Sequence, residues 1–137
     1  MNRVKAFTLI EMMAVVVIIG ILAAVIAPKF FHQVGSAEIT AAKQDIRSIE
    51  QAISLYRMDT GGFPDTLRDL TREPDNVRRW NGPYLPHEPK DPWGNRYEYI
   101  APGNDGRPFD VWSLGADGQD GGEDDAADIT SWKTDED

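Results

Sequence analysis

The feature that most constrains this chain is an apolar run from Phe7 to Ala27, in which Glu11 is the only charged residue. As a helix of about 21 residues it would reach about 31 Å, enough to cross the hydrocarbon core of a bilayer. An ionised carboxylate in lipid costs several kcal/mol, so Glu11 needs either a partner or a position near headgroups and water. Both interpretations remain open at this point. Arg3 and Lys5 precede the run and favour a cytoplasmic N-terminus, with everything after the run across the membrane.

An ordinary cleaved secretory signal is the competing interpretation of this N-terminus. Such a signal has a basic start, an apolar core and a small-x-small cleavage site. The basic start is present, but Glu11 interrupts the approach to the apolar core, and no clean Ala-x-Ala site precedes Pro28. The sequence therefore favours a retained membrane segment.

The order of residues around Glu11 is similar to the prepilin signal of type IV pilins and pseudopilins. Mature chains of that family usually begin with Phe and carry Glu at the fifth position, which here are Phe7 and Glu11. The resemblance implies that a prepilin peptidase cuts between Ala6 and Phe7 on the cytoplasmic side, and that the new Phe7 amine is methylated. The family nearly always has Gly before the cut. Ala6 has the next smallest side chain, and we expect cleavage to survive this departure.

Composition excludes some classes of function. At 137 residues the chain holds one domain besides the apolar segment, and its formal charge is −9. Removing Arg3 and Lys5 with residues 1–6 makes the mature chain more acidic still. Such a surface repels phosphate backbones and argues against nucleic acid as a partner. The chain has no cysteine, which excludes disulfides and thiol chemistry.

The apolar pattern stays helical beyond Pro28. Apolar residues recur at spacings of three and four, which is one narrow face of a helix, and they are Ile39, Ala42, Ile46, Ile49, Ile53 and Tyr56. Charged residues fall off this face: Glu38, Lys43, Asp45, Arg47, Glu50 and Arg57. We therefore predict one helix from about Thr8 to about Met58, with Gly20 and Pro28 as its two weak points. Because the stripe is short, packing on the chain's own domain is favoured over a coiled-coil seam.

The remainder of the chain predicts a small antiparallel sheet. Gly61 and Gly62 end the helix, and Asp65 is placed to cap a short helical turn after them. A proline-rich loop occupies residues 73–92. Strand-like runs at 96–100 and 109–114 flank a turn cluster and predict a hairpin, and residues 129–132 could add a third strand. The predicted class is α+β.

Residues 117–128 read DGQDGGEDDAAD, with six acids and three glycines. A solvated acidic loop is one interpretation. The other is a Ca²⁺ site, because glycine permits tight turns and Ca²⁺ takes 6–8 oxygen ligands. The spacing does not match an EF-hand. A small domain without disulfides has a marginal core, and a metal is a common way to stabilise one.

Two further motifs extend the resemblance over nearly the whole chain. Asp91-Pro92-Trp93-Gly94 followed by a Tyr-containing strand, and the run from Asp110 to Gly118, resemble the major pseudopilins of type II secretion, the general secretion pathway protein G family, as does the run from Tyr56 to Asp59. The resemblance implies a type IV pilin-like fold with one Ca²⁺ in the acidic loop. Carried over by position, carboxylates would come from Asp117, Asp124 and Asp125, and carbonyls from Leu114 and Gln119.

The resemblance also implies an organisation and a function. We expect a leader at 1–6, a membrane and filament-core helix at 7–28, an amphipathic half at 29–58, and a small periplasmic αβ domain at 59–137 with the acidic loop at 114–128. The chain would be a single-pass inner-membrane protein that assembles into a periplasmic pseudopilus for export of folded proteins. Expected partners are its own copies, minor pseudopilins, an assembly platform, a cytoplasmic ATPase and membrane lipid. Glu11 would pair with the Phe7 amine of a neighbouring copy, with pairing inside one chain as the alternative, and Pro28 would mark where the helix can extend during assembly.

Three alternatives stay open. The chain could serve a type IV pilin-like filament of another machine, or it could be a signal-anchored or secreted calcium-binding module acting alone. An enzyme is the third and is disfavoured, because His32 and His87 are the only histidines and no catalytic, zinc or nucleotide motif is visible. We expect no enzymatic activity.

Overall fold

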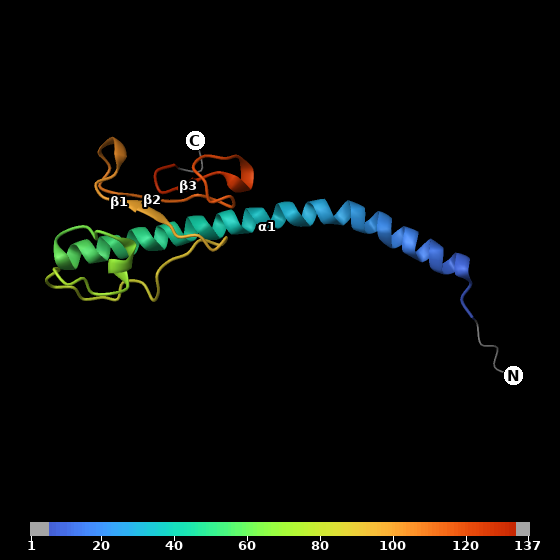
Figure 1. Ribbon diagram of the computed structural model, residues 1–137, viewed down its shortest axis with the longest axis horizontal. Coiled ribbons are helices and arrows are strands. Elements are labelled where there is room, and N and C mark those ends of the chain that lie inside the picture. Colours follow the sequence, from blue (N-terminus) through green and yellow to red (C-terminus); the bar gives the residue numbers. More distant parts are fainter. Residues whose placement is uncertain (1–5, 134–137) are drawn as a thin grey trace. The chain divides into compact units, whose positions relative to one another are not determined.

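The structure, a computed structural model, describes the backbone of residues 6–133 and the side chains of that range except residues 28–34. Its main element is α1, a helix of 52 residues at Leu9–Thr60 (Figure 1). The prediction of one helix from about Thr8 to about Met58 is confirmed, and its backbone is helical through both Gly20 and Pro28. The chain divides into two compact units, Met1–Gly35 and Ser36–Asp137, so α1 contributes to both.

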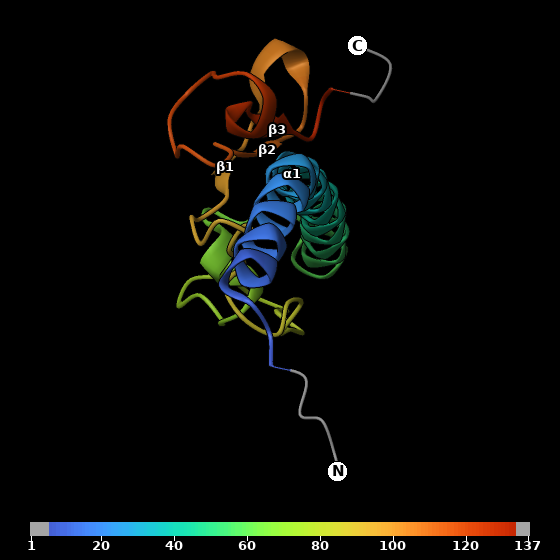
Figure 2. The same cartoon turned by 90° about the vertical axis from the view of Figure 1, so that its right-hand side faces the viewer.

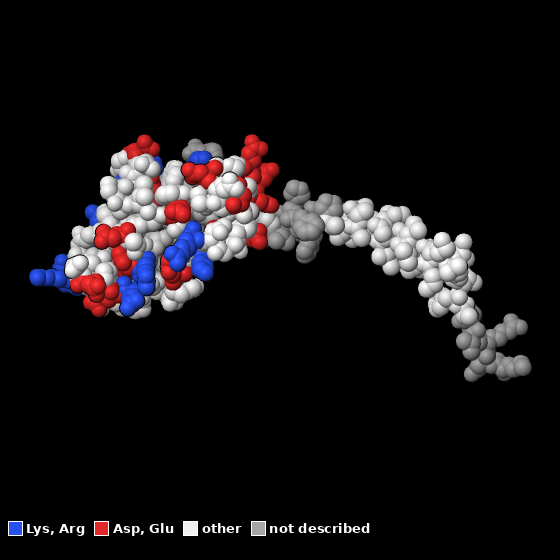
Figure 3. Space-filling view, in the orientation of Figure 1, with Lys and Arg blue, Asp and Glu red and all other residues white. Residues whose placement is uncertain are grey.

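The first unit is defined by its exposed apolar surface. Leu9–Ala27 has a mean hydropathy of 2.9 with none of its residues buried, and it is long and apolar enough to cross a membrane. The face of this segment seen in Figure 3 carries no charged side chain. Within the described residues of this unit, nothing covers the apolar side chains, so they require lipid or other helices around them.

In the second unit, the predicted apolar stripe is the buried face of α1. Ile46, Ile49, Ile53 and Tyr56 are each at most 3% exposed, and Ala42 and Ala52 are buried with them. These residues form one core with Leu67, Leu70, Tyr97, Val111 and Ile129. The stripe therefore packs on the chain's own domain, as predicted. The helix ends at Thr60, and Gly61 follows it with a φ of +84° that suits glycine and an N–H that donates to the Arg57 carbonyl at 2.9 Å.

The predicted hairpin is present with shorter strands. It is formed by β1 (Glu98–Ile100) and β2 (Asp110–Ser113), and β3 (Ile129–Thr130) pairs with the other edge of β2. The order is β1-β2-β3 and both pairings are antiparallel, with Tyr99 opposite Val111 and Ser113 opposite Ile129. In Figures 1 and 2 this sheet lies along one side of the second half of α1.

Three single-turn 3₁₀ helices complete the described elements: η1 (Leu67–Leu70), η2 (Asn104–Gly106) and η3 (Asp124–Ala126). The predicted turn after the glycines is η1, but Asp65 does not cap it. Its N-cap is Thr66, and Asp69 accepts N–H hydrogen bonds from both Asp65 and Thr66. Asp69, inside the first turn, thereby satisfies the N–H groups of the two residues that precede η1.

Acidic side chains of α1 beside the packed face also make contacts with the rest of the domain. Three carboxylates of α1 accept hydrogen bonds from aromatic side chains of the segment between α1 and β1. Glu38 accepts from Trp93 Nε1 at 2.9 Å, Asp45 from the Tyr97 hydroxyl at 2.9 Å, and Asp59 from the Tyr84 hydroxyl at 2.8 Å. These contacts tie residues 84–97, which precede β1, to the helix beside the apolar core.

Candidate functional site

The N-terminus of α1 is capped by the side chains of Thr8 and Glu11. The Thr8 N–H and hydroxyl both donate to Glu11 Oε2, at 2.7 and 2.9 Å, and the Glu11 N–H donates to Thr8 Oγ1 at 3.3 Å. This is a capping box, and it satisfies backbone donors that the first turn would otherwise leave unpaired. The sequence reasoning missed this partner for Glu11, although the Thr-x-x-Glu spacing was its signal.

The residues predicted for processing lie just before the helix. Ala6 and Phe7 precede α1 in irregular backbone and are exposed, Phe7 by 78%. The first five residues of the predicted leader lie outside the described residues. Pro28 has helical backbone, and its side chain is outside the described set.

The acidic loop is closed at its neck by backbone contacts. The Ala116 N–H donates to the Asp125 carbonyl at 3.0 Å, which joins the two sides of the loop. Gly115 has a φ of +68°, and a Cβ placed on it would lie 2.8 Å from the Ala127 carbonyl oxygen. Only glycine fits there, for both reasons. Asp117 comes directly after Ala116, and Asp124 directly before Asp125. The neck therefore brings the predicted ligands from the start and the end of the loop near each other.

The predicted ligands do not converge as a finished metal centre. No group of three His, Cys, Asp or Glu side chains in the described part of the chain could hold a metal ion. Asp117, Asp124 and Asp125 are exposed, and Asp117 Oδ1 accepts the Gln119 N–H at 3.0 Å. Asp124 has a φ of +53°, an uncommon conformation for a residue with a Cβ. Three carboxylates could coordinate one ion only after their side chains turned toward one another.

Asp128, a further acid of the loop that the sequence reasoning did not select, has one buried oxygen without a described partner. Asp128 Oδ2 accepts the Gly121 N–H at 3.0 Å, whereas Asp128 Oδ1 is buried and has no hydrogen-bond partner among the described residues. A buried carboxylate oxygen without a partner is costly unless a cation or donor satisfies it. The predicted ligand atoms and Asp128 Oδ1 are all oxygen atoms, which suits a hard cation such as Ca²⁺. The chemistry of the loop thus fits the predicted ion.

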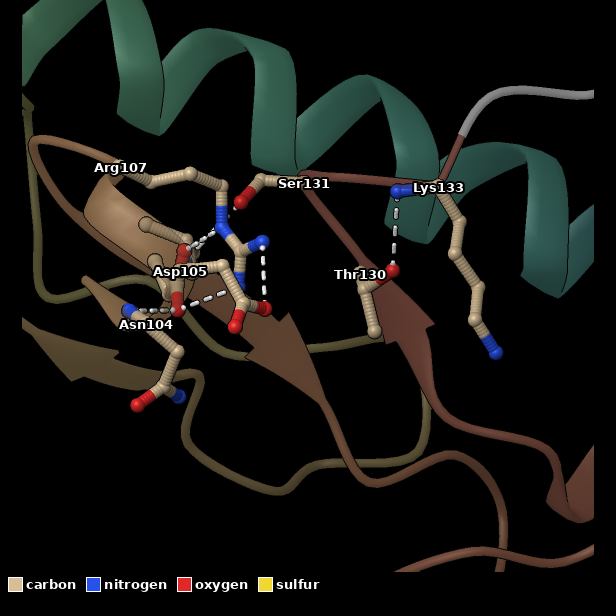
Figure 4. Close-up of polar contacts among 8 residues, drawn as sticks. Asn104, Asp105, Arg107, Thr130, Ser131 and Lys133 are labelled. Atoms are coloured by element: carbon tan, nitrogen blue, oxygen red, sulfur yellow. Dashed lines mark hydrogen bonds and ion pairs between the residues drawn. The ribbon is translucent and has the colours of Figure 1, made fainter.

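An ion pair with one buried partner lies at the turn end of the hairpin, and it too was missed from sequence. Asp110 is fully buried, accepts the Asn104 N–H at 2.8 Å, and accepts hydrogen bonds from both Nε and Nη2 of Arg107, the latter at 3.0 Å. Arg107 Nη1 also donates to Asp105 Oδ2 at 3.3 Å (Figure 4). The hydrogen bond from Arg107 holds the pKa of Asp110 below its ordinary value. Arg107 also lies over the Trp132 ring, 4.8 Å from its centroid, and so ties the C-terminal segment to the hairpin.

Comparisons with known proteins agree with this combination of an exposed apolar helix, a short antiparallel sheet and an acidic loop. A family model described as type II secretion system (T2SS), protein G matches residues 29–132, and one described as a prokaryotic N-terminal methylation motif matches residues 1–27. The crystal structure of the major pseudopilin from the type 2 secretion system of enterohaemorrhagic Escherichia coli superposes with a TM-score of 0.60 at 29% identity. That match covers 71% of this chain and 88% of that chain. The fold is that of a pseudopilin.

Curated relatives narrow the class to one family. The type II secretion system core protein G of Pseudomonas aeruginosa is 47% identical over 135 residues, covering 93% of this chain and 94% of the relative. The Vibrio cholerae protein of the same name is 43% identical and covers 96% and 94%. The chain belongs to the type II secretion system protein G family, the major pseudopilins.

Proposed function

We propose that this chain is the repeating subunit of a periplasmic pseudopilus that drives export of folded proteins across the outer membrane. The observation that carries the proposal is the apolar stretch Leu9–Ala27, which none of the described residues buries and which is long enough for a membrane span. In the bilayer, lipid covers it; in a filament, the same stretch of neighbouring copies does. The subunit's role is structural rather than catalytic, and movement comes from a cytoplasmic ATPase acting through an inner-membrane platform.

Proteolytic processing is part of this proposal. A prepilin peptidase cuts between Ala6 and Phe7 and methylates the new amine, consistent with the match of residues 1–27 to the methylation motif. The intact mass of protein extracted from membranes tests both steps. The expected mass corresponds to residues 7–137 plus one methyl group. A mass beginning at Met1, or one beginning near Pro28, would contradict the proposal.

The acidic loop is proposed to bind one Ca²⁺. The ligands are the carboxylates of Asp117, Asp124 and Asp125 with the carbonyls of Leu114 and Gln119. We add Asp128, because its Oδ1 is buried without a described partner. When bound, the ion supplies positive charge that several neighbouring carboxylates need in order to pack together. These residues orient around it and close the loop.

Removal of calcium tests this site. A ligand bound only by the folded state stabilises by about 2.7 kcal/mol at a hundredfold excess over Kd. We therefore expect chelator to lower the melting temperature of the full chain in detergent. Ca²⁺ should restore it and Mg²⁺ should not, because Mg²⁺ requires compact octahedral geometry and retains its waters. Asp117→Ala and Asp128→Ala should each abolish the calcium-dependent rise. A melting curve that chelator leaves unchanged would mean the loop is only an acidic surface.

A further inference from the structure

A buried polar network joins two segments that lie apart in the sequence. Asp91, in the turn before β1, is 4% exposed, and Ser113, at the end of β2, is fully buried. Asp91 Oδ1 accepts the N–H groups of Trp93 and Asn95 at 3.1 and 2.8 Å. The second oxygen, Oδ2, accepts the Ser113 hydroxyl at 2.7 Å. Both oxygens of Asp91 are therefore occupied, and its charge is held inside the domain by these donors.

The network continues into the acidic loop through one peptide group. Ser113 Oγ accepts the Gly115 N–H at 3.1 Å. A hydroxyl has one proton and two lone pairs, so donation to Asp91 leaves the lone pairs for Gly115. The peptide between Leu114 and Gly115 is planar and trans, so its carbonyl points away from its N–H. Ser113 thus determines the direction of the Leu114 carbonyl, a proposed calcium ligand.

Other contacts hold the same glycine. Asn95 Nδ2 lies 3.5 Å from the Gly115 carbonyl oxygen, which also accepts the Gly118 N–H at 3.4 Å. On its other side Gly115 lies against the Ala127 carbonyl, with no room for a Cβ. The turn at 91–95 and the neck of the acidic loop are therefore connected on both the N–H and the carbonyl side of Gly115.

We infer that Ser113, oriented by Asp91, is a positioning residue for the cation bound in the acidic loop, because it aims the Leu114 carbonyl at the ion. This inference rests on the proposed calcium site. Neither side chain contacts the ion. Loss of such an outer partner typically weakens metal binding 10- to 100-fold, and we expect that loss for Ser113→Ala.

The test compares two variants that each lose one hydroxyl. Full-length protein in detergent is depleted of metal, and calcium binding is measured by calorimetric titration. Ser113→Ala should bind about 10- to 100-fold more weakly than wild type. The matched control is Tyr99→Phe, which removes a hydroxyl that donates to the Pro64 carbonyl at 2.9 Å, in β1 and away from the loop. Its calcium affinity should equal that of wild type.

A spectroscopic measurement separates positioning from a general loss of stability. Terbium(III) replaces calcium in oxygen sites, and its luminescence lifetimes in H₂O and D₂O report how many waters the ion binds. If the Leu114 carbonyl turns away in Ser113→Ala, water takes its place, so the variant should hold about one more water than wild type. An equal number of bound waters in both proteins would overturn the inference.

The remaining outcomes are also decisive. If wild type binds no calcium, the proposed site and this inference both fail. If wild type binds and Ser113→Ala binds equally well, the inference alone fails. Should Ser113→Ala not fold, Asp91→Asn carries the test. Its single oxygen would stay with the Trp93 and Asn95 N–H groups, so the Ser113 proton would lose its acceptor and the hydroxyl its fixed orientation, which should also weaken calcium binding. Unchanged affinity in that variant would overturn the inference.

Discussion

At the scale of single residues, the two buried carboxylates of the described residues, Asp91 and Asp110, and the membrane-segment carboxylate Glu11 each have a specific partner. Thr8 donates hydrogen bonds to Glu11, Arg107 to Asp110, and Ser113 to Asp91. Asp128 is the exception, since one of its oxygens has no described partner. Burying or desolvating a charge without a partner is costly, so these pairs are where single substitutions have the largest effect.

Glu11→Leu should insert and be cleaved but assemble poorly. In an unassembled copy Thr8 satisfies the carboxylate. In the filament we expect the Phe7 amine of a neighbour to bind it, because opposite charges attract strongly in lipid. Filament yield by electron microscopy measures this. Glu11→Gln is the matched control: it keeps an acceptor for Thr8 but lacks the charge, and it too should assemble poorly. Wild-type yield from Glu11→Leu would refute the pairing.

Arg107→Met should destabilise the domain at neutral pH, because it leaves the buried Asp110 without its cation. The effect should depend on pH. The folded-state pKa of Asp110 lies below its ordinary value, so the pair's contribution is complete above the unfolded pKa of about 3.9. That contribution is lost as pH falls through the lower folded pKa. Urea unfolding between about pH 2 and 6 measures it, with Arg107→Lys as an intermediate control. Equal acid sensitivity in wild type and Arg107→Met would contradict this account.

At the scale of elements, the second half of α1 is held by two kinds of contact. The apolar stripe supplies burial, and Glu38, Asp45 and Asp59 beside it accept bonds from Trp93, Tyr97 and Tyr84. The three acids are separated by multiples of seven residues, which returns each to nearly the same side of the helix. Burial raises the pKa of Tyr97, with the hydrogen bond to Asp45 as a further cause, so its hydroxyl stays a donor at neutral pH.

Tyr97→Phe should destabilise the domain by about 0.5–1.5 kcal/mol, the usual net value of one hydrogen bond. Ile53→Ala, in the fully buried stripe, should cost about 2–5 kcal/mol because it also leaves a cavity. Chemical unfolding of both variants in detergent measures the two contributions. If Tyr97→Phe cost as much as Ile53→Ala, the aromatic hydrogen bonds rather than the apolar stripe would dominate the attachment of α1.

At the scale of the whole molecule, the two units have opposite requirements. Residues of the first unit expose apolar side chains that need lipid or other helices, whereas the second unit has its own core and an acidic loop. One helix, α1, contributes residues to both units. When the surroundings of the first unit change from lipid to a filament, the backbone that must adapt is therefore part of this continuous helix.

In the filament, we expect helix to be lost locally between Gly20 and Pro28. Proline lacks an N–H and its ring clashes with the carbonyl four residues earlier, so the turn before it is the weakest part of a helix that is continuous here. A map of the filament by electron microscopy tests this. Filaments of Pro28→Ala should keep more helix in that stretch. Continuous hydrogen-bonded helix from Gly20 to Pro28 in wild-type filaments would count against the prediction.

The sequence by itself determined the elements of this protein. Periodicity at spacings of three and four, with Gly61 as a stop, predicted α1 to within two residues at its C-terminal end, and the turn cluster after Ile100 predicted the β1–β2 hairpin. These are local properties: each depends on residues within a few positions of one another, so they can be read along the chain.

Only the tertiary structure decided which polar groups meet. Ser113 and Asp91 are 22 positions apart, and Trp93 and Glu38 are 55 apart. In the acidic loop, the family resemblance implied Asp117, Asp124 and Asp125, whereas the fold buries an oxygen of Asp128. Composition could show that the loop was rich in acids. Which carboxylate faces inward depends on how the neck closes against β2 and β3, and that closure brings together residues that no local pattern connects.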